Sequence, residues 1–154
     1  GTLQLLSAKA FDMEVCDKIF KTNVFSAMAI TKVLLKKNNK KALKKILFIS
    51  ALYSKKGAIG NSFYASSKGA LDSYMRSIAK ELAPTVKVNS ILPGGINTEI
   101  TNTSSEEQKE IIEKSYPLGF GETTDVANMV EFLFSPKADW ITGQQILVDG
   151  GASI

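Results

Sequence analysis

The chain carries the stretch Tyr64-Ala65-Ser66-Ser67-Lys68-Gly69-Ala70 near its middle. Tyr64 and Lys68 stand four positions apart, so on a helix their side chains share one face, one turn from each other. A Lys68 ammonium in that position favours the phenolate and is expected to lower the pKa of Tyr64. A tyrosine tuned in this way can hand a proton to a carbonyl oxygen or take one from an alcohol. Because such pairs are more often plain surface contacts, the surrounding sequence decides between the two interpretations.

Three short apolar runs, rich in residues that favour strands, lie on either side of this stretch. They span residues 45–50, 86–92 and 144–148, and each predicts a buried strand. The segments between them have helical spacing. Strands that alternate with helices predict a parallel sheet covered on both faces, which is a three-layer α/β/α fold.

The helical segments show apolar residues every three or four positions, with capping residues or prolines near their ends. Residues 97–115 are polar, and a mobile segment with one or two short helices is expected there. The predicted helices run from the cap Asp12 to about Lys37 with a bend near Asn23, from Asn61 or Ser62 to about Leu82, and from the candidate cap Thr124 through Phe134.

Composition narrows the chemistry. No histidine is present among the 154 residues, which excludes a Ser-His-Asp triad and a His-ligated metal site within the chain, and no metal is expected. Cys16 is the single cysteine and cannot form an internal disulfide, which agrees with a cytoplasmic protein. No apolar run reaches the roughly 18 residues of a membrane span, so no membrane insertion is expected. Lysines cluster within residues 36–45 without interleaved aromatic rings, so nucleic-acid binding is not expected.

Further motifs follow one another along nearly the whole chain. They are Thr22-Asn23-Val24, Lys45-Ile46-Leu47-Phe48-Ile49-Ser50, Val88-Asn89-Ser90-Ile91-Leu92-Pro93-Gly94 with Thr98, Asp125-Val126-Ala127 with Phe132-Leu133, Ile141-Thr142-Gly143-Gln144, and Val148-Asp149-Gly150-Gly151. In this combination and order, the chain resembles the short-chain dehydrogenase/reductase family, its 3-oxoacyl carrier-protein reductases among them. The resemblance implies a Rossmann-like, doubly wound parallel sheet that binds NAD or NADP.

The resemblance also implies roles for individual side chains. Tyr64 would be the general acid/base, and Lys68 would hold the nicotinamide ribose hydroxyls and bias the charge of Tyr64. Asn23 would hold a water molecule of a proton relay through its helix backbone. Further cofactor contacts would come from Pro93 and Gly94, which let the chain pass close to the nicotinamide ring, and from Ile96 and Thr98, which fix its carboxamide.

The serine that the family usually carries thirteen positions before its tyrosine is missing, because position 51 holds Ala51. Ser50 stands one place earlier, where strand alternation points its side chain to the opposite side. Three interpretations stay open: a bulged loop lets Ser50 serve as the catalytic serine, a neighbour such as Ser54 substitutes for it, or the hydroxyl is absent. By analogy with oxyanion-hole donors, its loss lowers the rate by a factor on the order of 10²–10³.

The phosphate-binding turn is a second departure from the family. No strand-to-helix turn of the Gly-x-x-x-Gly-x-Gly kind is present, although such a turn normally cradles the pyrophosphate. We therefore expect residues 1–154 to be the C-terminal part of a single NAD(P)-binding domain whose N-terminal strands are missing, and to be inactive alone. The choice between NAD and NADP stays open because the region that selects between them is missing too.

Two functions follow from these observations. The leading one is NAD(P)-dependent hydride transfer between nicotinamide and a small carbonyl or alcohol substrate. The alternative is a non-catalytic binding or scaffolding subunit, which Ala51 favours and the intact Tyr64, Lys68 and Asn23 oppose. The resemblance further implies a homodimer or homotetramer, in which the helix over 14–36 and the Tyr64 helix bury apolar surface from Phe25, Ala29, Leu71, Tyr74 and Met75.

Overall fold

The computed structural model describes residues 1–37, 39, 42–98 and 114–154 of the chain. Its strands β1 (Lys45–Ile49), β2 (Lys87–Pro93) and β3 (Gln145–Val148) form one parallel sheet in the order β1-β2-β3. All three predicted strands are confirmed, and their ends differ from the predicted ends by one residue at most. The segment expected to be mobile lies mostly outside the described residues.

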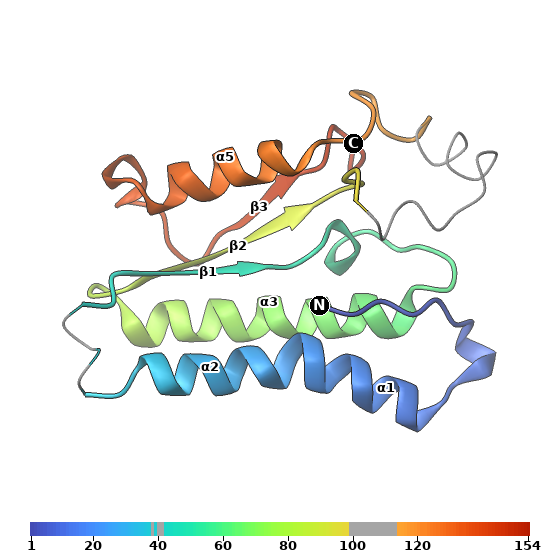
Figure 1. Cartoon of the computed structure of the whole chain (residues 1–154), viewed down its shortest axis with the longest axis horizontal. Coiled ribbons are helices and arrows are strands. Elements are labelled where there is room, and N and C mark those ends of the chain that lie inside the picture. Colours follow the sequence, from blue (N-terminus) through green and yellow to red (C-terminus); the bar gives the residue numbers. More distant parts are fainter. Residues whose placement is uncertain (38, 40–41, 99–113) are drawn as a thin grey trace.

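Helices cover both faces of this sheet (Figure 1). On one face α3 (Ser62–Leu82) packs against the strands, with α1 (Met13–Phe20) and α2 (Ser26–Leu34) alongside it, whereas α5 (Thr123–Phe134) covers the other face. The expected three-layer α/β/α fold is therefore confirmed for this part of the chain. Short 3-10 turns lie at η1 (Ala8–Ala10), η3 (Leu52–Ser54) and η5 (Pro136–Ala138).

The bend predicted near Asn23 is a π-helical turn, η2 (Lys21–Phe25), which joins α1 to α2 without a break. A π-helical turn widens the backbone spiral locally and is common at functional sites. It carries Asn23 and Val24, which are both buried, toward α3. The sequence motif around Asn23 therefore marks a local departure from regular α-helix.

The core has β2 at its centre, because both faces of this strand are covered by helices. Val88 and Ile91, three residues apart, are both 0% exposed. Leu71 and Met75 of α3 are buried against the first face of the sheet. The expectation that these two residues supply an outer contact surface is therefore wrong, since the face of α3 that bears them is the one that packs on the strands.

Helix starts follow local capping chemistry. The Asp12 side chain accepts hydrogen bonds from the backbone N–H groups of Glu14 and Val15, at 2.8 and 3.1 Å, which confirms it as a cap. Thr124 is not a cap, because α5 already begins one residue earlier, after Glu122. There the Glu122 N–H donates to Asp125 Oδ2 at 2.8 Å, so the acidic side chain within the first turn satisfies the helix start.

Candidate active site

The site lies where the three parallel strands end at the same edge of the sheet. Backbone hydrogen bonds hold the following segments together: Ser50 N–H donates to Ile91 O at 2.8 Å, and Gly94 N–H donates to Val148 O at 3.0 Å. The turn η3 follows β1 and packs against α3. In open α/β sheets, ligands bind outside the carboxyl ends of the strands, so this edge is the place where functional side chains should gather.

Tyr64 and Lys68 lie on adjacent turns near the start of α3, as predicted. The Lys68 ammonium lies 5.7 Å from the centroid of the Tyr64 ring and donates a hydrogen bond to Ile49 O at 3.0 Å. Lys68 is only 6% exposed, whereas Tyr64 is half-buried. The last carbonyl of β1 therefore fixes the ammonium beneath the edge of the sheet, next to the phenol.

The electrostatics of this pair differ from the prediction. Burial raises the pKa of Tyr64 to about 12, and the charge of nearby Tyr53 adds to the shift. Burial also lowers the pKa of Lys68, an effect that Asp72 opposes. The expectation of a lowered pKa for Tyr64 is wrong for this structure, because burial of the phenol and the nearby Tyr53 both raise it. Tyr64 therefore keeps its proton at neutral pH.

The Asn23 side chain is buried and joins three segments of the chain. Its Oδ1 accepts from Thr2 N–H at 2.7 Å, and its Nδ2 donates to Thr2 O at 2.9 Å and to Ser67 Oγ at 3.0 Å. Ser67 in turn donates to Tyr64 O at 2.7 Å. These bonds tie the π-helical turn to the first turns of α3, so Asn23 is placed beside the Tyr64–Lys68 pair.

The segment around the missing serine contains three small residues with different surroundings. Ala51 is 6% exposed, and its methyl group offers no hydrogen bond. Ser50 is also buried, and its hydroxyl donates to Lys68 O at 3.4 Å, so it faces the α3 backbone. Ser54 Oγ is buried and has no hydrogen-bond partner among the residues that the structure describes.

The loop after β2 passes close to the ends of two other segments. A side chain at Gly94 would meet the Asp149 backbone and the Tyr116 ring, both at 2.8 Å, so only glycine fits. Ile96 forms a parallel bridge with Gly121, and Thr98 Oγ1 donates to Ile96 O at 3.4 Å. The four candidate cofactor contacts therefore lie together at the carboxyl edge, with Pro93 as the last residue of β2 and Gly94, Ile96 and Thr98 on the braced loop that follows.

Two residues of this region were missed from the sequence. Asp72, one turn beyond Lys68 on α3, is 1% exposed, and its Oδ1 accepts from Ser90 Oγ at 2.8 Å. Its Oδ2 has no partner within the described part of the chain. The spacing of Lys68 and Asp72 could have revealed this buried charge. Tyr116 packs against the Gly94 loop, and no spacing signal links these two distant positions.

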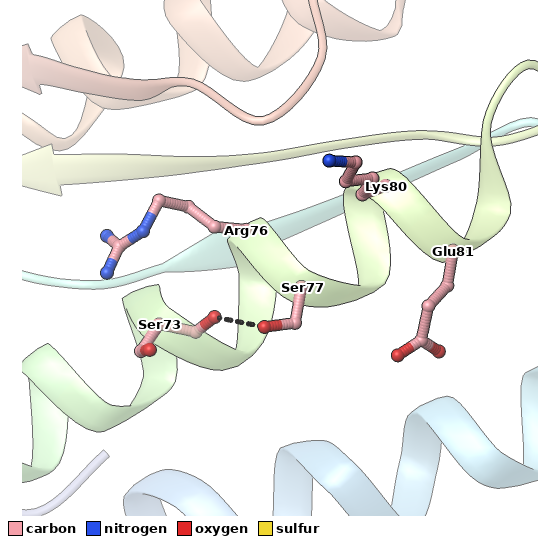
Figure 2. A pocket seen from close by; sticks show the side chains of 5 residues that line it. All are labelled: Ser73, Arg76, Ser77, Lys80 and Glu81. Atoms are coloured by element: carbon pink, nitrogen blue, oxygen red, sulfur yellow. Dashed lines mark hydrogen bonds between the residues drawn. The ribbon is translucent and has the colours of Figure 1, made fainter.

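Other surfaces do not compete with this site. A surface hollow on α3, shown in Figure 2, is lined by residues of the later turns, Ser73, Arg76, Ser77, Lys80 and Glu81. None of them belongs to the Tyr64–Lys68 region. Within residues 1–37, 39, 42–98 and 114–154, no group of three or more acidic, His or Cys side chains could hold a metal ion. In the same ranges, no helix combines the length and the apolar character that a bilayer crossing needs.

Comparison with known proteins agrees with this geometry. The family model described as Enoyl-(Acyl carrier protein) reductase matches residues 5–153. The 3-oxoacyl-[acyl-carrier-protein] reductase FabG of Aquifex aeolicus is 39% identical over 137 residues, which are 88% of this chain and 55% of that protein. The chain thus spans about half the length of the curated relatives it matches.

Solved structures share the fold almost completely. A 4-hydroxyisoleucine dehydrogenase mutant complexed with NADH and succinate has a TM-score of 0.92 at 25% identity, with 99% of this chain and 65% of that one covered. A putative 2-deoxy-d-gluconate 3-dehydrogenase from Agrobacterium tumefaciens with bound NADP has a TM-score of 0.88 at 28% identity, with 99% and 64% covered. These relatives differ in substrate and in nicotinamide cofactor, so the comparisons identify a family and no single reaction.

Proposed function

Because the chain belongs to the short-chain dehydrogenase/reductase family, we propose that its protein is an NAD(P)-dependent oxidoreductase acting on a carbonyl or alcohol substrate, with Tyr64 as the general acid/base. The observation that carries the proposal is the buried Lys68 ammonium, held by Ile49 O beside the Tyr64 phenol at the carboxyl edge. A buried cation next to a phenol is unfavourable unless other interactions offset its burial. A catalytic role would explain why the chain keeps a buried ammonium beside this phenol, whereas packing alone would not.

The residues present fit the nicotinamide half of the cofactor. Lys68 Nζ donates one hydrogen bond to Ile49 O, and an ammonium has three hydrogens, so donors remain for ribose hydroxyls. The loop from Pro93 to Thr98 would hold the ring and its carboxamide, with Gly94 keeping the backbone close to β3. When bound, the cofactor supplies or accepts the hydride. We leave both NAD and NADP open, since relatives with either are found.

Tyr64 holds the proton that a carbonyl reduction requires. Its pKa of about 12 keeps the phenol protonated across the neutral range, so it can donate to a carbonyl oxygen while the adjacent carbon receives hydride. Asn23, tied to Thr2 and Ser67, would support the path by which Tyr64 regains a proton. A hydroxyl near Tyr64 would hold the substrate oxygen, and the sequence points to Ser50 or Ser54. Carbonyl reduction is therefore the direction we propose at neutral pH.

The first substrate class to test is a 3-oxoacyl thioester, because the Aquifex aeolicus relative is a 3-oxoacyl-[acyl-carrier-protein] reductase. The carboxyl edge of this chain also bears apolar side chains in solvent: Ile59 and Leu118 are 103% and 84% exposed. Exposed apolar side chains beside a site suit a substrate that carries an apolar tail.

A non-catalytic binding subunit is the second candidate, and Ala51 favours it. Without the hydroxyl at this position, the substrate oxygen loses a donor that relatives of the family usually provide. The two candidates make different predictions for Tyr64. A binding subunit needs the ring for packing only, whereas an oxidoreductase needs the hydroxyl.

The test is Tyr64→Phe in the full-length protein, assayed with a panel of 3-oxoacyl thioesters and small carbonyl compounds. The ring stays, so folding and cofactor binding are expected to persist while turnover falls by roughly 10²–10⁴-fold. Tyr74→Phe is the matched control, because Tyr74 lies on the same helix and packs edge-on against Phe48 at 6.1 Å. Equal turnover of Tyr64→Phe and wild type overturns the acid/base role. No turnover by wild type on the whole panel favours the binding subunit.

We also place the protein in the cytoplasm as a homodimer or homotetramer. The helices α1, η2 and α2 expose apolar side chains, including Phe25 at 51% and Ile30 at 61%. A second copy that packs α1 and α2 against its own would cover them. Light scattering of the full-length protein is expected to give a mass of two or four chains, and a monomer at micromolar concentration contradicts this assembly.

A further inference from the structure

Ser67 stands on α3 between the two residues of the acid/base pair, three positions after Tyr64 and one position before Lys68. Its neighbour Ser66 is exposed, whereas Ser67 is 0% exposed. Burial of a hydroxyl lowers stability unless hydrogen bonds offset it. The partners of the Ser67 hydroxyl therefore indicate what the chain gains from it, and both partners belong to the candidate site.

The Ser67 hydroxyl both donates and accepts a hydrogen bond. It gives its one hydrogen to Tyr64 O at 2.7 Å and accepts a hydrogen from Asn23 Nδ2 at 3.0 Å. A bond from a serine to a carbonyl three or four residues earlier is common within helices. The bond from Asn23 is different, because it crosses 44 positions of the sequence and joins α3 to the π-helical turn η2.

The hydrogen on Ser67 also determines which way the Asn23 amide faces. Because that hydrogen goes to Tyr64 O, the Ser67 oxygen can only accept from Asn23. The amide nitrogen therefore faces Ser67 and uses its second hydrogen on Thr2 O at 2.9 Å, while Oδ1 accepts from Thr2 N–H at 2.7 Å. A rotated amide would place its oxygen against two acceptors. Both amide hydrogens are thus used, and the side chain has a single orientation.

The carbonyl that Ser67 binds links the two residues of the acid/base pair. In an α-helix each carbonyl accepts the N–H of the residue four positions later, and for Tyr64 that residue is Lys68. The Ser67 hydroxyl adds a second bond to the same carbonyl, and Asn23 holds this hydroxyl from η2. The first turns of α3 therefore cannot slide or rotate against η2 without the loss of a buried hydrogen bond. Any such shift would move the phenol and the ammonium together.

We propose that Ser67 is a positioning residue of this site, whose hydroxyl ties Tyr64 to Asn23 and so holds the phenol where it can give its proton to the substrate oxygen. The inference rests on the proposed oxidoreductase function. In the reaction Ser67 keeps its own proton, and no covalent bond to it forms or breaks. A misplacement of about 1 Å can lower a rate by a factor on the order of 10², so a small shift of the phenol is enough for a measurable loss.

The first test compares Ser67→Ala with wild type in the full-length protein. The variant removes both hydrogen bonds and is expected to lower kcat by roughly 10-fold or more, with the KM for the cofactor little changed. The solvent deuterium isotope effect on kcat should rise, because a displaced phenol slows the proton step. Ser77→Ala is the matched control, since Ser77 lies on the same helix and its hydroxyl donates to Ser73 O at 3.2 Å, away from the site. Its kcat should equal that of wild type.

The second test asks whether Ser67 acts through Asn23. Once Asn23→Ala has removed the amide, the Ser67 hydroxyl no longer joins α3 to η2. The double variant with Ser67→Ala should therefore be no slower than Asn23→Ala alone, whereas losses that multiply, as they do for independent sites, overturn the role. Circular dichroism verifies the fold of each variant. Ser67→Cys, which keeps the volume and weakens both bonds, takes the place of Ser67→Ala if that variant does not fold.

The outcomes separate two failures. If wild type turns over and Tyr64→Phe does not, but Ser67→Ala matches wild type in kcat, the role of Ser67 is overturned and the proposed function stands. The role is also overturned if kcat falls while the solvent isotope effect keeps its wild-type value, because the loss then does not arise at the proton step. If wild type shows no turnover with any carbonyl compound, the proposed function fails, and the positioning role of Ser67 fails with it.

Discussion

The two ends of the parallel sheet differ in how many of their buried polar atoms form hydrogen bonds. At the carboxyl end, Ser54 Oγ, Asn61 Oδ1 and Asp149 Oδ2 are buried without a hydrogen-bond partner in the described part of the chain. At the amino end, Lys45 Nζ lies 2.7 Å from Asp139 Oδ1 and also donates to Ser135 O at 2.5 Å. The carboxyl end thus contains buried polar atoms that make no hydrogen bond, whereas the Lys45 ammonium at the amino end has two partners.

From this difference we infer that the carboxyl end serves a ligand and that the amino end serves the fold. A buried polar atom without a partner lowers stability by roughly 1–3 kcal/mol, and such groups persist where something other than packing requires them. The carboxyl end also holds the buried Lys68 ammonium and the Tyr64 phenol with its raised pKa. Substitutions at the carboxyl end should therefore lower activity, whereas substitutions at the amino end should leave activity at the wild-type level.

Lys68→Met is expected to have the largest effect. It removes the ammonium that lies beside the Tyr64 phenol and that we propose to hold the ribose, so turnover should fall by roughly 10²–10⁴-fold, with weaker cofactor binding. Stability should hold or rise by about 1 kcal/mol, because an apolar chain of similar volume replaces a buried charge. Steady-state kinetics and urea denaturation measure the two quantities in the full-length protein.

Lys80→Met on the same helix is the matched control. Lys80 is exposed and lines the surface hollow of Figure 2 rather than the site. Neither turnover nor cofactor binding should change in this variant. If Lys68→Met lost stability without losing activity, the carboxyl end would be ordinary core, and the contrast between the two ends would disappear.

Met75→Ala probes the layer between the two ends. Met75 is 0% exposed in the cluster that α3 forms with β1 and β2, so its truncation leaves a cavity and should lower the free energy of unfolding by roughly 2–5 kcal/mol. Turnover per folded molecule should stay at the wild-type level. Met13→Ala provides the comparison, since Met13 is 65% exposed and its loss should be small.

Local sequence signals predicted most of the fold and part of the site. Short runs of strand-favouring residues and a capping side chain located the three strands and the Asp12 helix start, because these signals depend on neighbours in sequence. The pKa of Tyr64 is raised rather than lowered as predicted. The cause is burial by segments distant in sequence, which the spacing of Tyr64 and Lys68 cannot reveal. Tyr116 was missed for the same reason: its contact with Gly94 joins positions that only the fold brings together.

Alkaline pH should lower the free energy of unfolding through the ionisation of Tyr64. The pKa of Tyr64 is raised from 10.0 to about 12 in the folded protein. Its contribution to stability is therefore fully present below pH 10 and is lost as the pH rises from about 10 to 12. The loss should be on the order of 2 kcal/mol for Tyr64.

The measurement is the difference in unfolding free energy between wild type and Tyr64→Phe at pH 9 and at pH 11.5. The difference cancels lysine deprotonation, which is common to both proteins. It also cancels most of the contribution of Lys68, whose lowered pKa acts in the opposite sense by favouring the folded state as the pH rises toward 10.5. A difference that stays constant with pH would show that the Tyr64 phenol is no less solvated in the folded protein than in the unfolded chain.

Asp139→Asn at the amino end should have the smallest effect. The Lys45 hydrogen bond to the Asp139 carboxylate lowers the pKa of Asp139, so this interaction stabilises the fold above the ordinary pKa of 3.8 and is lost as the pH falls through the lowered value. Asp139 lies at the surface, where solvent screens the pair, and Lys45 keeps its second partner, Ser135 O, after the change. The midpoint of thermal unfolding at pH 7 should therefore be unchanged within error, and turnover should equal that of wild type. A clear loss of stability that high salt does not reduce would mean that the amino end depends on this single ion pair, and that the hydrogen bond from Lys45 to Ser135 O does not compensate for its loss.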